Sequence, residues 1–129
     1  MTKAANKDDL VVKEGDYQRL TALIEKVSSP VAEQLEEELS RADVVPSSEY
    51  PQDAVCMGAK VRFIDLATNK ENEVTLVYPA EVSVEEMKIS VLTPMGAALM
   101  GMRVGGVIDW ELPSQKKVKI EVLAVTQDL

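Results

Sequence analysis

Carboxylates are the side chains best suited to chemistry in this 129-residue chain, which contains no histidine and a single cysteine. The lack of histidine excludes catalytic triads, histidine metal sites and histidine acid–base catalysis. A lone cysteine can form neither an internal disulfide nor a cysteine zinc cluster. We therefore interpret Cys56 as a small buried apolar residue.

The acidic residues lie mainly in one segment. Glu36, Glu37 and Glu38 are consecutive, and neighbouring positions of a helix diverge by about 100° around its axis, so they cannot converge on one cation. We interpret them as a solvated helix face. Glu25 and Glu33 flank the tip of a predicted helical hairpin, and they form the one carboxylate pair there that could approach a shared Mg²⁺.

Glycines and methionines cluster in "LTPMGAALMGMRVGGVIDWELP", residues 92–113. A phosphate-binding loop would need lysine at position 102, where methionine stands, and the spacing of a dinucleotide fingerprint is absent. The plain interpretation is that residues 97–99 pack a short helix onto a sheet. The alternative is an adaptable docking surface, since methionine suits such surfaces. Its residues would be Thr93, Pro94, Met95 and Met100.

The net charge of −8 argues against free nucleic acid as a partner, and in particular against direct sequence-specific binding. It permits docking to a basic surface. No apolar run reaches the roughly 18 residues that a membrane span requires. The N-terminal residues lack the apolar region of a signal peptide. These features predict a cytoplasmic protein with no membrane partner.

Two helices are predicted within residues 16–43. An apolar stripe marks each one: Tyr17, Leu20, Leu23, Ile24 and Val27, then Val31, Leu35, Leu39 and Ala42. Asp16 is expected to cap the first helix, and Ser29 with Pro30 to begin the second. Each arm of about 12–14 residues would span about 18–21 Å. Residues 14–43 hold eight acidic and three basic residues, so the hairpin is an acidic prong.

From Ala59 the apolar pattern has period two, which is typical of strands. Strand patterns occur at 60–66, 73–79, 88–94, 107–113 and 117–125, with a short helix expected at 95–102. The order β-β-β-α-β-β predicts an α+β fold with an antiparallel sheet covered by one helix. The chain divides into a flexible N-terminus (1–13), a short antiparallel helical hairpin (14–45), a linker (46–58) and a sheet domain (59–129).

Three stretches carry a family resemblance: "EELSRADVVPSSEYPQDAV" at 37–55, "TLVYPAEV" at 75–82 and "ISVLTPMGAALMGMRVGGVIDWELP" at 89–113. They resemble the Rnk family, the regulators of nucleoside diphosphate kinase. The pattern Pro-x-x-x-Ala-Leu-x-Gly-x-x-Val-Gly at 94–105 is also similar to the C-terminal domain of the transcript-cleavage factors GreA and GreB. The resemblance covers most of residues 16–125.

The resemblance implies an FKBP-like C-terminal domain and a short N-terminal antiparallel coiled coil. In the Gre family, the C-terminal domain grips the rim of the RNA polymerase secondary channel. A long coiled coil carries acidic residues to the active site, where they hold Mg²⁺ and stimulate cleavage of backtracked RNA. Here the arms are short, and the tip "SSP" at 28–30 carries no carboxylate.

The resemblance therefore predicts a monomeric regulator that docks at the channel rim and competes with Gre factors without stimulating cleavage. It would be no enzyme and would need no cofactor, metal or catalytic residue. The matching loop and helix assign polymerase contacts to Thr93, Pro94, Met95 and Met100, with electrostatic support from Glu33, Glu36 and Glu37. The alternatives are a cleavage factor that uses Glu25 and Glu33, and an indirect effect on nucleoside diphosphate kinase.

Overall fold

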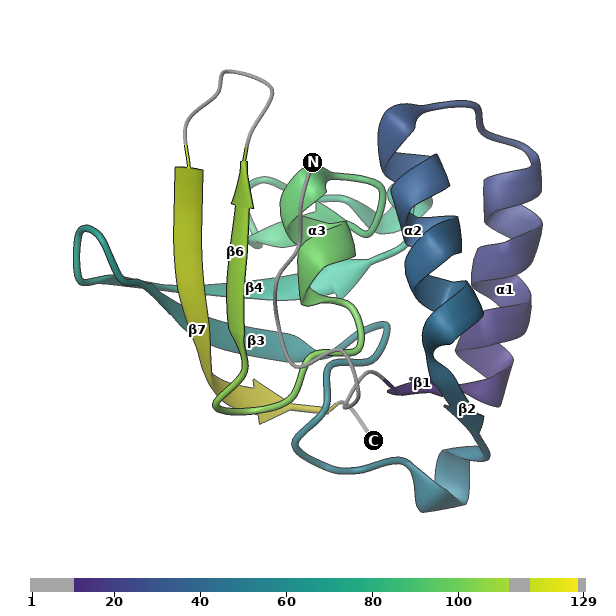
Figure 1. The fold of residues 1–129 in the computed structure, drawn as a ribbon, viewed down its shortest axis with the longest axis horizontal. Helices are drawn as coiled ribbons and strands as arrows, with labels where there is room; N and C mark the ends of the chain where they lie inside the picture. The colour runs from purple at the N-terminus through teal and green to yellow at the C-terminus, as the bar shows by residue number, and fades with distance from the viewer. Residues whose placement is uncertain (1–10, 112–116, 128–129) are drawn as a thin grey trace.

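Two helices joined by a short loop open the structure, a computed structural model that describes residues 11–111 and 117–127. Helices α1 (Glu14–Glu25) and α2 (Pro30–Arg41) contain 12 residues each and lie side by side in opposite directions (Figure 1). Ser29 Oγ accepts the N–H of Ala32 at 3.1 Å, and Pro30 occupies the first helical position. The predicted start of the second helix is thereby confirmed.

The predicted cap of the first helix is wrong. Helix α1 begins at Glu14 and its N-cap is Lys13, which makes no side-chain capping bond. The chain enters α1 directly from strand β1 (Val11–Lys13), so the helix starts before Asp16. Asp16 lies in the first turn, and its Oδ2 accepts the N–H of Met57 at 3.2 Å, a bond that ties α1 to a distant part of the chain.

A small parallel sheet closes the base of the helical hairpin. Strand β1 pairs in parallel with β2 (Asp43–Val45), and the two helices form the crossover that parallel strands require. Val12 of β1 is only 1% exposed. Residues 1–10 of the N-terminal segment lie outside the described residues, and the domain boundaries proposed from the sequence stay a prediction.

The main sheet has five strands in the order β5-β4-β3-β7-β6. Their bounds are β3 Lys60–Asp65, β4 Lys70–Val77, β5 Lys88–Ser90, β6 Val107–Glu111 and β7 Lys117–Thr126. All pairings are antiparallel except β4 with β5, which is parallel. The sequence predicted an antiparallel sheet throughout. The connection 78–87, which includes the 3₁₀ helix η3 (Pro79–Glu81), returns the chain along β4, so β5 runs in the same direction.

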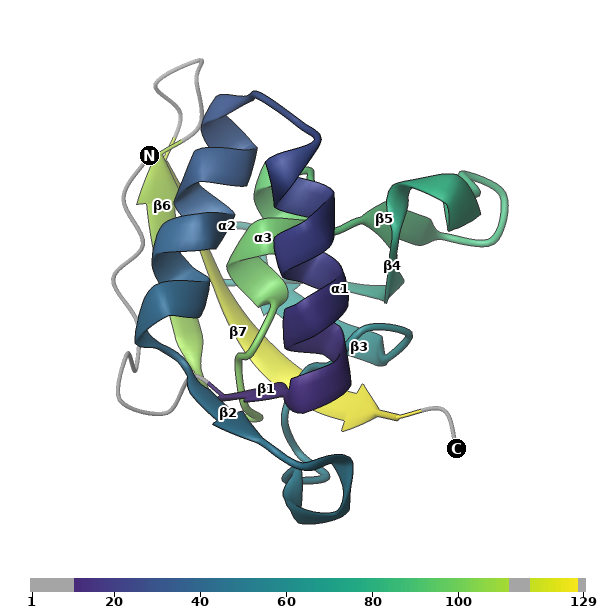
Figure 2. The same ribbon diagram turned by 90° about the vertical axis from the view of Figure 1, so that its right-hand side faces the viewer.

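Helix α3 (Pro94–Leu99) lies between the sheet and the helical hairpin (Figures 1 and 2). The buried side chains of all three layers form one core. Residues 50–59 contribute to it after the 3₁₀ helix η2 (Ser47–Glu49), and they include Cys56, which is 2% exposed and buried as predicted. The core includes Leu20, Leu35, Leu39, Tyr50, Val55, Val61, Phe63, Leu76, Ala97, Leu99, Ile108, Ile120 and Val122.

The α+β class predicted from the sequence is confirmed. Strand periodicity places Val61 and Phe63 in the core while Arg62 between them is exposed. Within residues 11–111 and 117–127, no helix combines the length and apolarity needed to cross a membrane.

Candidate functional site

The segment Thr93–Met95 comprises the N-cap and the first two residues of helix α3, and hydrogen bonds of Thr93 hold it in place. Thr93 is the N-cap: its Oγ1 accepts the N–H of Gly96 at 3.0 Å and donates to the carbonyl of Ser90 at 2.7 Å. Pro94 occupies the first helical turn, where its missing N–H costs no hydrogen bond. Thr93, Pro94 and Met95 are all partly exposed. The segment therefore offers a fixed backbone and accessible side chains to a partner.

Gly96 sets how closely α3 approaches the preceding strand. A Cβ atom at this position would lie 2.9 Å from both the carbonyl carbon of Ser90 and the Cα of Val91, and closer still to the Ser90 carbonyl oxygen. Any side chain here would push α3 away from β5. The glycine of the "PMGAAL" motif is thus a packing requirement that keeps the Thr93–Met95 segment in place.

Met100 does not lie on the surface expected from the sequence. Its side chain is 5% exposed and belongs to the core, together with Leu99 and Met102. Helix α3 ends at Leu99, and the chain then turns so that the backbone N–H of Gly101 bonds the carbonyl of Val55 at 3.1 Å. This turn directs Met100 inward. Of the four residues predicted to contact a partner at α3, only Thr93, Pro94 and Met95 are partly exposed.

Sequence reasoning missed a more exposed apolar surface in the connection between β4 and β5. Val84 is 86% exposed, and Val82 and Met87 are 47% and 49% exposed. We call these three residues the apolar loop. The connection projects to one side of the molecule, clear of the helices (Figure 2). The available signal was apolar residues alternating with Glu and Ser in "EVSVEEM", outside any strand with a predicted partner.

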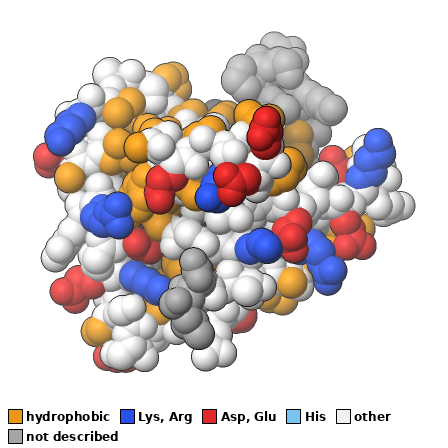
Figure 3. Space-filling model, turned by 180° about the vertical axis from the view of Figure 1, so that it is seen from behind, with side chains coloured by type: hydrophobic (Ala, Val, Ile, Leu, Met, Phe, Trp, Pro, Cys, Tyr) orange, Lys and Arg blue, Asp and Glu red, His pale blue; other side chains and the backbone are white. Residues whose placement is uncertain are grey.

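The apolar loop and the Thr93–Met95 segment lie at opposite ends of β5. This strand contains three residues, so it separates the two surfaces by about 10 Å. Elsewhere, acidic and basic side chains mix on the surface seen from behind (Figure 3). Exposed ion pairs of the sheet and its connections are Lys60–Glu73, Arg62–Glu71 and Lys88–Glu86. An apolar loop amid such a surface is a candidate for protein contact.

The acidic face of α2 is exposed, and the structure places Glu33, Glu36 and Glu37 on it as the sequence predicted. Glu38 differs from them because it is partly buried and pairs with Arg41 at 3.0 Å. Two other cations of the N-terminal part lie over aromatic rings. Lys13 Nζ lies 5.4 Å from the ring centre of Tyr50, and the Arg19 guanidinium 4.2 Å from that of Tyr78.

A polar cluster joins α1 to the sheet around Asp16. Besides the Met57 N–H, Asp16 faces the Tyr78 hydroxyl, whose oxygen is 3.5 Å from Oδ1. Burial raises the pKa of Asp16, although the Met57 N–H bond opposes the shift. Burial, with the nearby Asp16 charge, also raises the pKa of Tyr78 to about 12. The cluster fixes the hairpin against the sheet.

Tyr50 provides a second set of contacts between the N-terminal part and the rest of the protein. Its buried hydroxyl donates to the carbonyl of Val55 at 2.7 Å and lies 3.3 Å from the carbonyl of Val11. Burial raises the pKa of this hydroxyl, so it stays a donor. Burial likewise raises the pKa of the Cys56 thiol, which disfavours the nucleophilic thiolate. These groups are structural rather than reactive.

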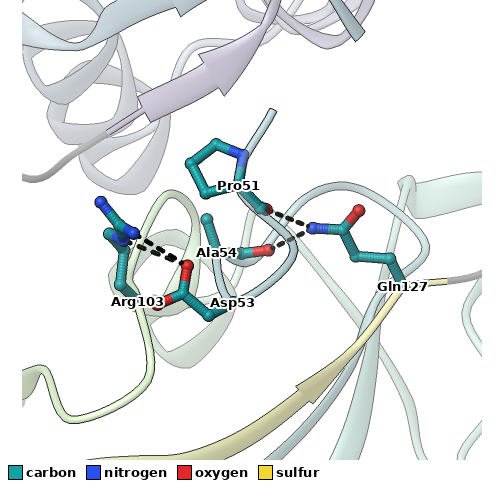
Figure 4. A network of polar contacts seen from close by, with 5 residues as sticks. All are labelled: Pro51, Asp53, Ala54, Arg103 and Gln127. Atoms are coloured by element: carbon teal, nitrogen blue, oxygen red, sulfur yellow. Dashed lines mark hydrogen bonds and ion pairs between the residues drawn. The ribbon is translucent and has the colours of Figure 1, made fainter. Parts of the chain in front are cut away.

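A third network ties residues 51–54 to the C-terminal half (Figure 4). Arg103 donates from Nε and Nη2 to Asp53 Oδ1 at 3.2 and 3.0 Å. Gln127 Nε2 donates to the carbonyls of Pro51 and Ala54 at 2.7 and 3.0 Å. The segment between the hairpin and the sheet is therefore held at several points.

The described residues contain no group of three or more His, Cys, Asp or Glu side chains arranged to hold a metal ion. Glu25 and Glu33, the carboxylate pair noted in the sequence, are both exposed. Their proposed sharing of Mg²⁺ stays a prediction that a cleavage assay decides.

Comparison with known proteins identifies the family. Residues 50–127 match the family described as "Transcription elongation factor, GreA/GreB, C-term", and residues 8–45 match "Rnk N-terminus". The chain belongs to the GreA/GreB–Rnk family. The Regulator of nucleoside diphosphate kinase of Escherichia coli K12 is 36% identical over 121 residues, 92% of this chain and 89% of the relative. The family resemblance inferred from the sequence is confirmed.

GreA of Thermodesulfovibrio yellowstonii is 38% identical over 94 residues, which are 73% of this chain but 59% of that protein. Among solved structures, a "Prokaryotic transcription elongation factor GreA/GreB from Nitrosomonas europaea" is 37% identical with a TM-score of 0.78. The match covers 92% of this chain and 98% of that one. Thermus aquaticus Gfh1 gives a TM-score of 0.52 at 27% identity, with 92% and 99% covered. The relationships support a transcription-factor-like regulator.

Proposed function

We propose that this protein binds RNA polymerase at the rim of the secondary channel through its sheet domain and competes there with Gre factors, without stimulating transcript cleavage. The sheet domain would have the FKBP-like fold that the resemblance implies. The docking surface would comprise the Thr93–Met95 segment and the apolar loop, with the acidic face of α2 facing a basic wall of the channel.

One observation carries the proposal: the helical hairpin packs against the body of the protein instead of extending from it. Leu20 of α1 and the α2 residues Leu35 and Leu39 belong to the same core as α3 and the sheet. The two helices lie beside α3 (Figure 2). Twelve residues give each helix a length of about 18 Å. The connecting residues 26–29 contain no carboxylate. Such a hairpin would occupy the entrance of the secondary channel but would carry no carboxylate deep into the channel.

A link to nucleoside diphosphate kinase is favoured by the name of the Escherichia coli relative. We propose that any such effect is indirect and passes through transcription. The acidic face of α2 and the apolar loop suit docking to polymerase. An effect that passes through transcription requires no separate binding site for the kinase.

The test is retention of core RNA polymerase by the full chain, with GreA as competitor, paired with a cleavage assay on a backtracked complex. We expect retention, displacement by GreA and no Mg²⁺-dependent cleavage. Cleavage would overturn the docking-only function and favour the role of Glu25 and Glu33. Failure to retain polymerase would overturn the proposal as a whole.

A pair of variants maps the docking surface. Val84→Asp places a charge in the apolar loop at a side chain that is 86% exposed, and Leu66→Asp does the same at the turn after β3, where Leu66 is 38% exposed. We expect Val84→Asp to weaken retention about tenfold or more, as for an apolar contact at an interface centre. Leu66→Asp should leave retention unchanged, and equal effects of the two would contradict the assignment.

A further inference from the structure

A groove of about 200 Å³ runs between the two helices, and its described lining residues all belong to α1 and α2. Ile24 and Leu39 form its apolar base, since they are 8% and 6% exposed. Tyr17 and the exposed Glu36 also line it. The remaining lining residues are Thr21 and Ser40. An apolar base beside one carboxylate, one phenol and two hydroxyls is an amphipathic receptor.

The charge of the groove is one-sided. Among the residues that the structure describes, Glu36 is the only charged lining residue, and no lysine or arginine lines the groove. Glu33 lies one helical turn before Glu36 on the same side of α2. Three cations of the N-terminal part are engaged with other groups: Lys13 and Arg19 lie over tyrosine rings, and Arg41 pairs with Glu38. The groove therefore favours a positively charged occupant.

The size of the groove selects a single side chain. Pockets for small-molecule ligands typically measure about 300–1,000 Å³, which exceeds the volume found here. A long cationic side chain can lay its aliphatic stem on apolar surface while its charged end stays polar. The base formed by Ile24 and Leu39 suits such a stem.

Arginine fits the polar groups better than lysine does. Its planar guanidinium stacks on an aromatic face, here that of Tyr17, and forms two parallel hydrogen bonds with a carboxylate, here that of Glu36. The Ser40 hydroxyl already donates to the carbonyl of Glu37 at 2.7 Å, so its oxygen is left to accept a further N–H. The Thr21 hydroxyl can also accept.

We propose that this groove receives an arginine side chain from a basic surface of the partner protein. The identification of that partner as RNA polymerase rests on the proposed function. The groove would then fix the orientation of the hairpin at the channel wall. The apolar loop, in the connection between β4 and β5, would supply a separate contact with the same partner.

The groove is tested first without polymerase. N-acetyl-arginine amide is titrated into the ¹⁵N-labelled full chain, and N-acetyl-citrulline amide serves as its neutral counterpart. We expect the amide signals of Thr21 and Ser40 to shift with the arginine probe and not with citrulline. Glu36→Gln should remove the shifts, and Glu49→Gln, which removes one exposed charge outside the hairpin, should preserve them. Equal shifts with both probes would overturn the groove as a cation site.

Two groove variants then test the contact with polymerase. Glu36→Gln should weaken binding about threefold to fivefold, as expected for a partly exposed ion pair. Thr21→Leu fills the groove with a good helix former and should weaken binding at least as much, whereas Ala22→Leu, on an exposed neighbouring position, should not. Unchanged binding by Glu36→Gln and Thr21→Leu would overturn the proposed contact. If the arginine probe binds but the wild type never retains polymerase, the proposed function fails and the cation groove is supported.

Discussion

Replacing Gly96 with alanine tests how the Thr93–Met95 segment is positioned. The added Cβ would lie 2.9 Å from two backbone carbons, those of the Ser90 carbonyl and the Val91 Cα, and even closer to the Ser90 carbonyl oxygen. Contacts below 3.0 Å are essentially absent for real Cβ atoms. The obstacle is backbone, which cannot rotate away as a side chain can, so α3 must move.

The expected cost follows from this geometry. Overpacking a core costs about 1–3 kcal/mol, and a backbone obstacle places this substitution at the upper end. Moving α3 also strains the cap in which Thr93 bonds both Ser90 and Gly96, and losing a cap costs about 1 kcal/mol. We expect a loss of about 3–4 kcal/mol, which lowers the melting temperature of a domain this size by about 10–15 °C.

Urea and thermal unfolding, followed by circular dichroism, measure the loss. Gly15→Ala is the matched control, because nothing lies within 4 Å of a Cβ at that position in α1. It should stabilise the protein by about 0.5 kcal/mol. A Gly96→Ala variant within about 0.5 kcal/mol of the wild type would refute the packing argument, since that is the range of ordinary surface substitutions. Because the Thr93–Met95 segment would be displaced, polymerase retention should fall as well.

Three further predictions concern polar side chains that connect segments far apart in the chain. The folded pKa of Asp16 lies above its unfolded value of 3.8, so its contribution to stability is present below pH 3.8 and is lost as the pH rises through the folded pKa. Urea midpoints of the wild type, measured from below pH 3.8 to above the folded pKa of Asp16, should therefore fall with rising pH. Asp16→Asn should make this fall smaller, and a fall of the same size in the variant would contradict the role given to Asp16. Tyr50→Phe should cost about 1 kcal/mol in urea unfolding through the lost bond to Val55, and no loss would show that the bond contributes nothing net. Gln127→Ala removes two bonds to backbone carbonyls and should cost about 1–2 kcal/mol by the same measurement; a neutral result would mean that water replaces the amide.

Local patterns in the sequence were enough to predict most elements. The apolar stripe of each helix, the Ser29–Pro30 start of α2 and the period-two strands express preferences of neighbouring residues. The structure has them where predicted, within a few residues at their ends. The order of elements along the chain from Ala59, with three strands before α3 and two after it, and the burial of Cys56 were also predicted from the sequence.

The candidate site was predicted only in part. Thr93, Pro94 and Met95 lie on a partly exposed segment, and Glu33, Glu36 and Glu37 are exposed. The inward position of Met100 could not be read from the sequence, because the turn after α3 depends on a backbone bond between Gly101 and Val55, 46 positions earlier in the chain. The apolar loop was missed because apolar periodicity predicts which face of a helix or strand is buried. It does not predict which side chains of a connection between two strands are exposed.

The sequence by itself determined the family, the α+β class, the acidic hairpin and the helix start at Ser29, because each depends on residues close together in the chain. Only the tertiary structure decided that β5 runs parallel to β4, that Asp16 bonds Met57 rather than capping α1, and that the hairpin lies against α3. These features depend on residues far apart in the chain whose contacts form only when the whole core packs. The burial of Met100 has the same origin, since the turn that follows α3 is held by the bond from Gly101 to the carbonyl of Val55.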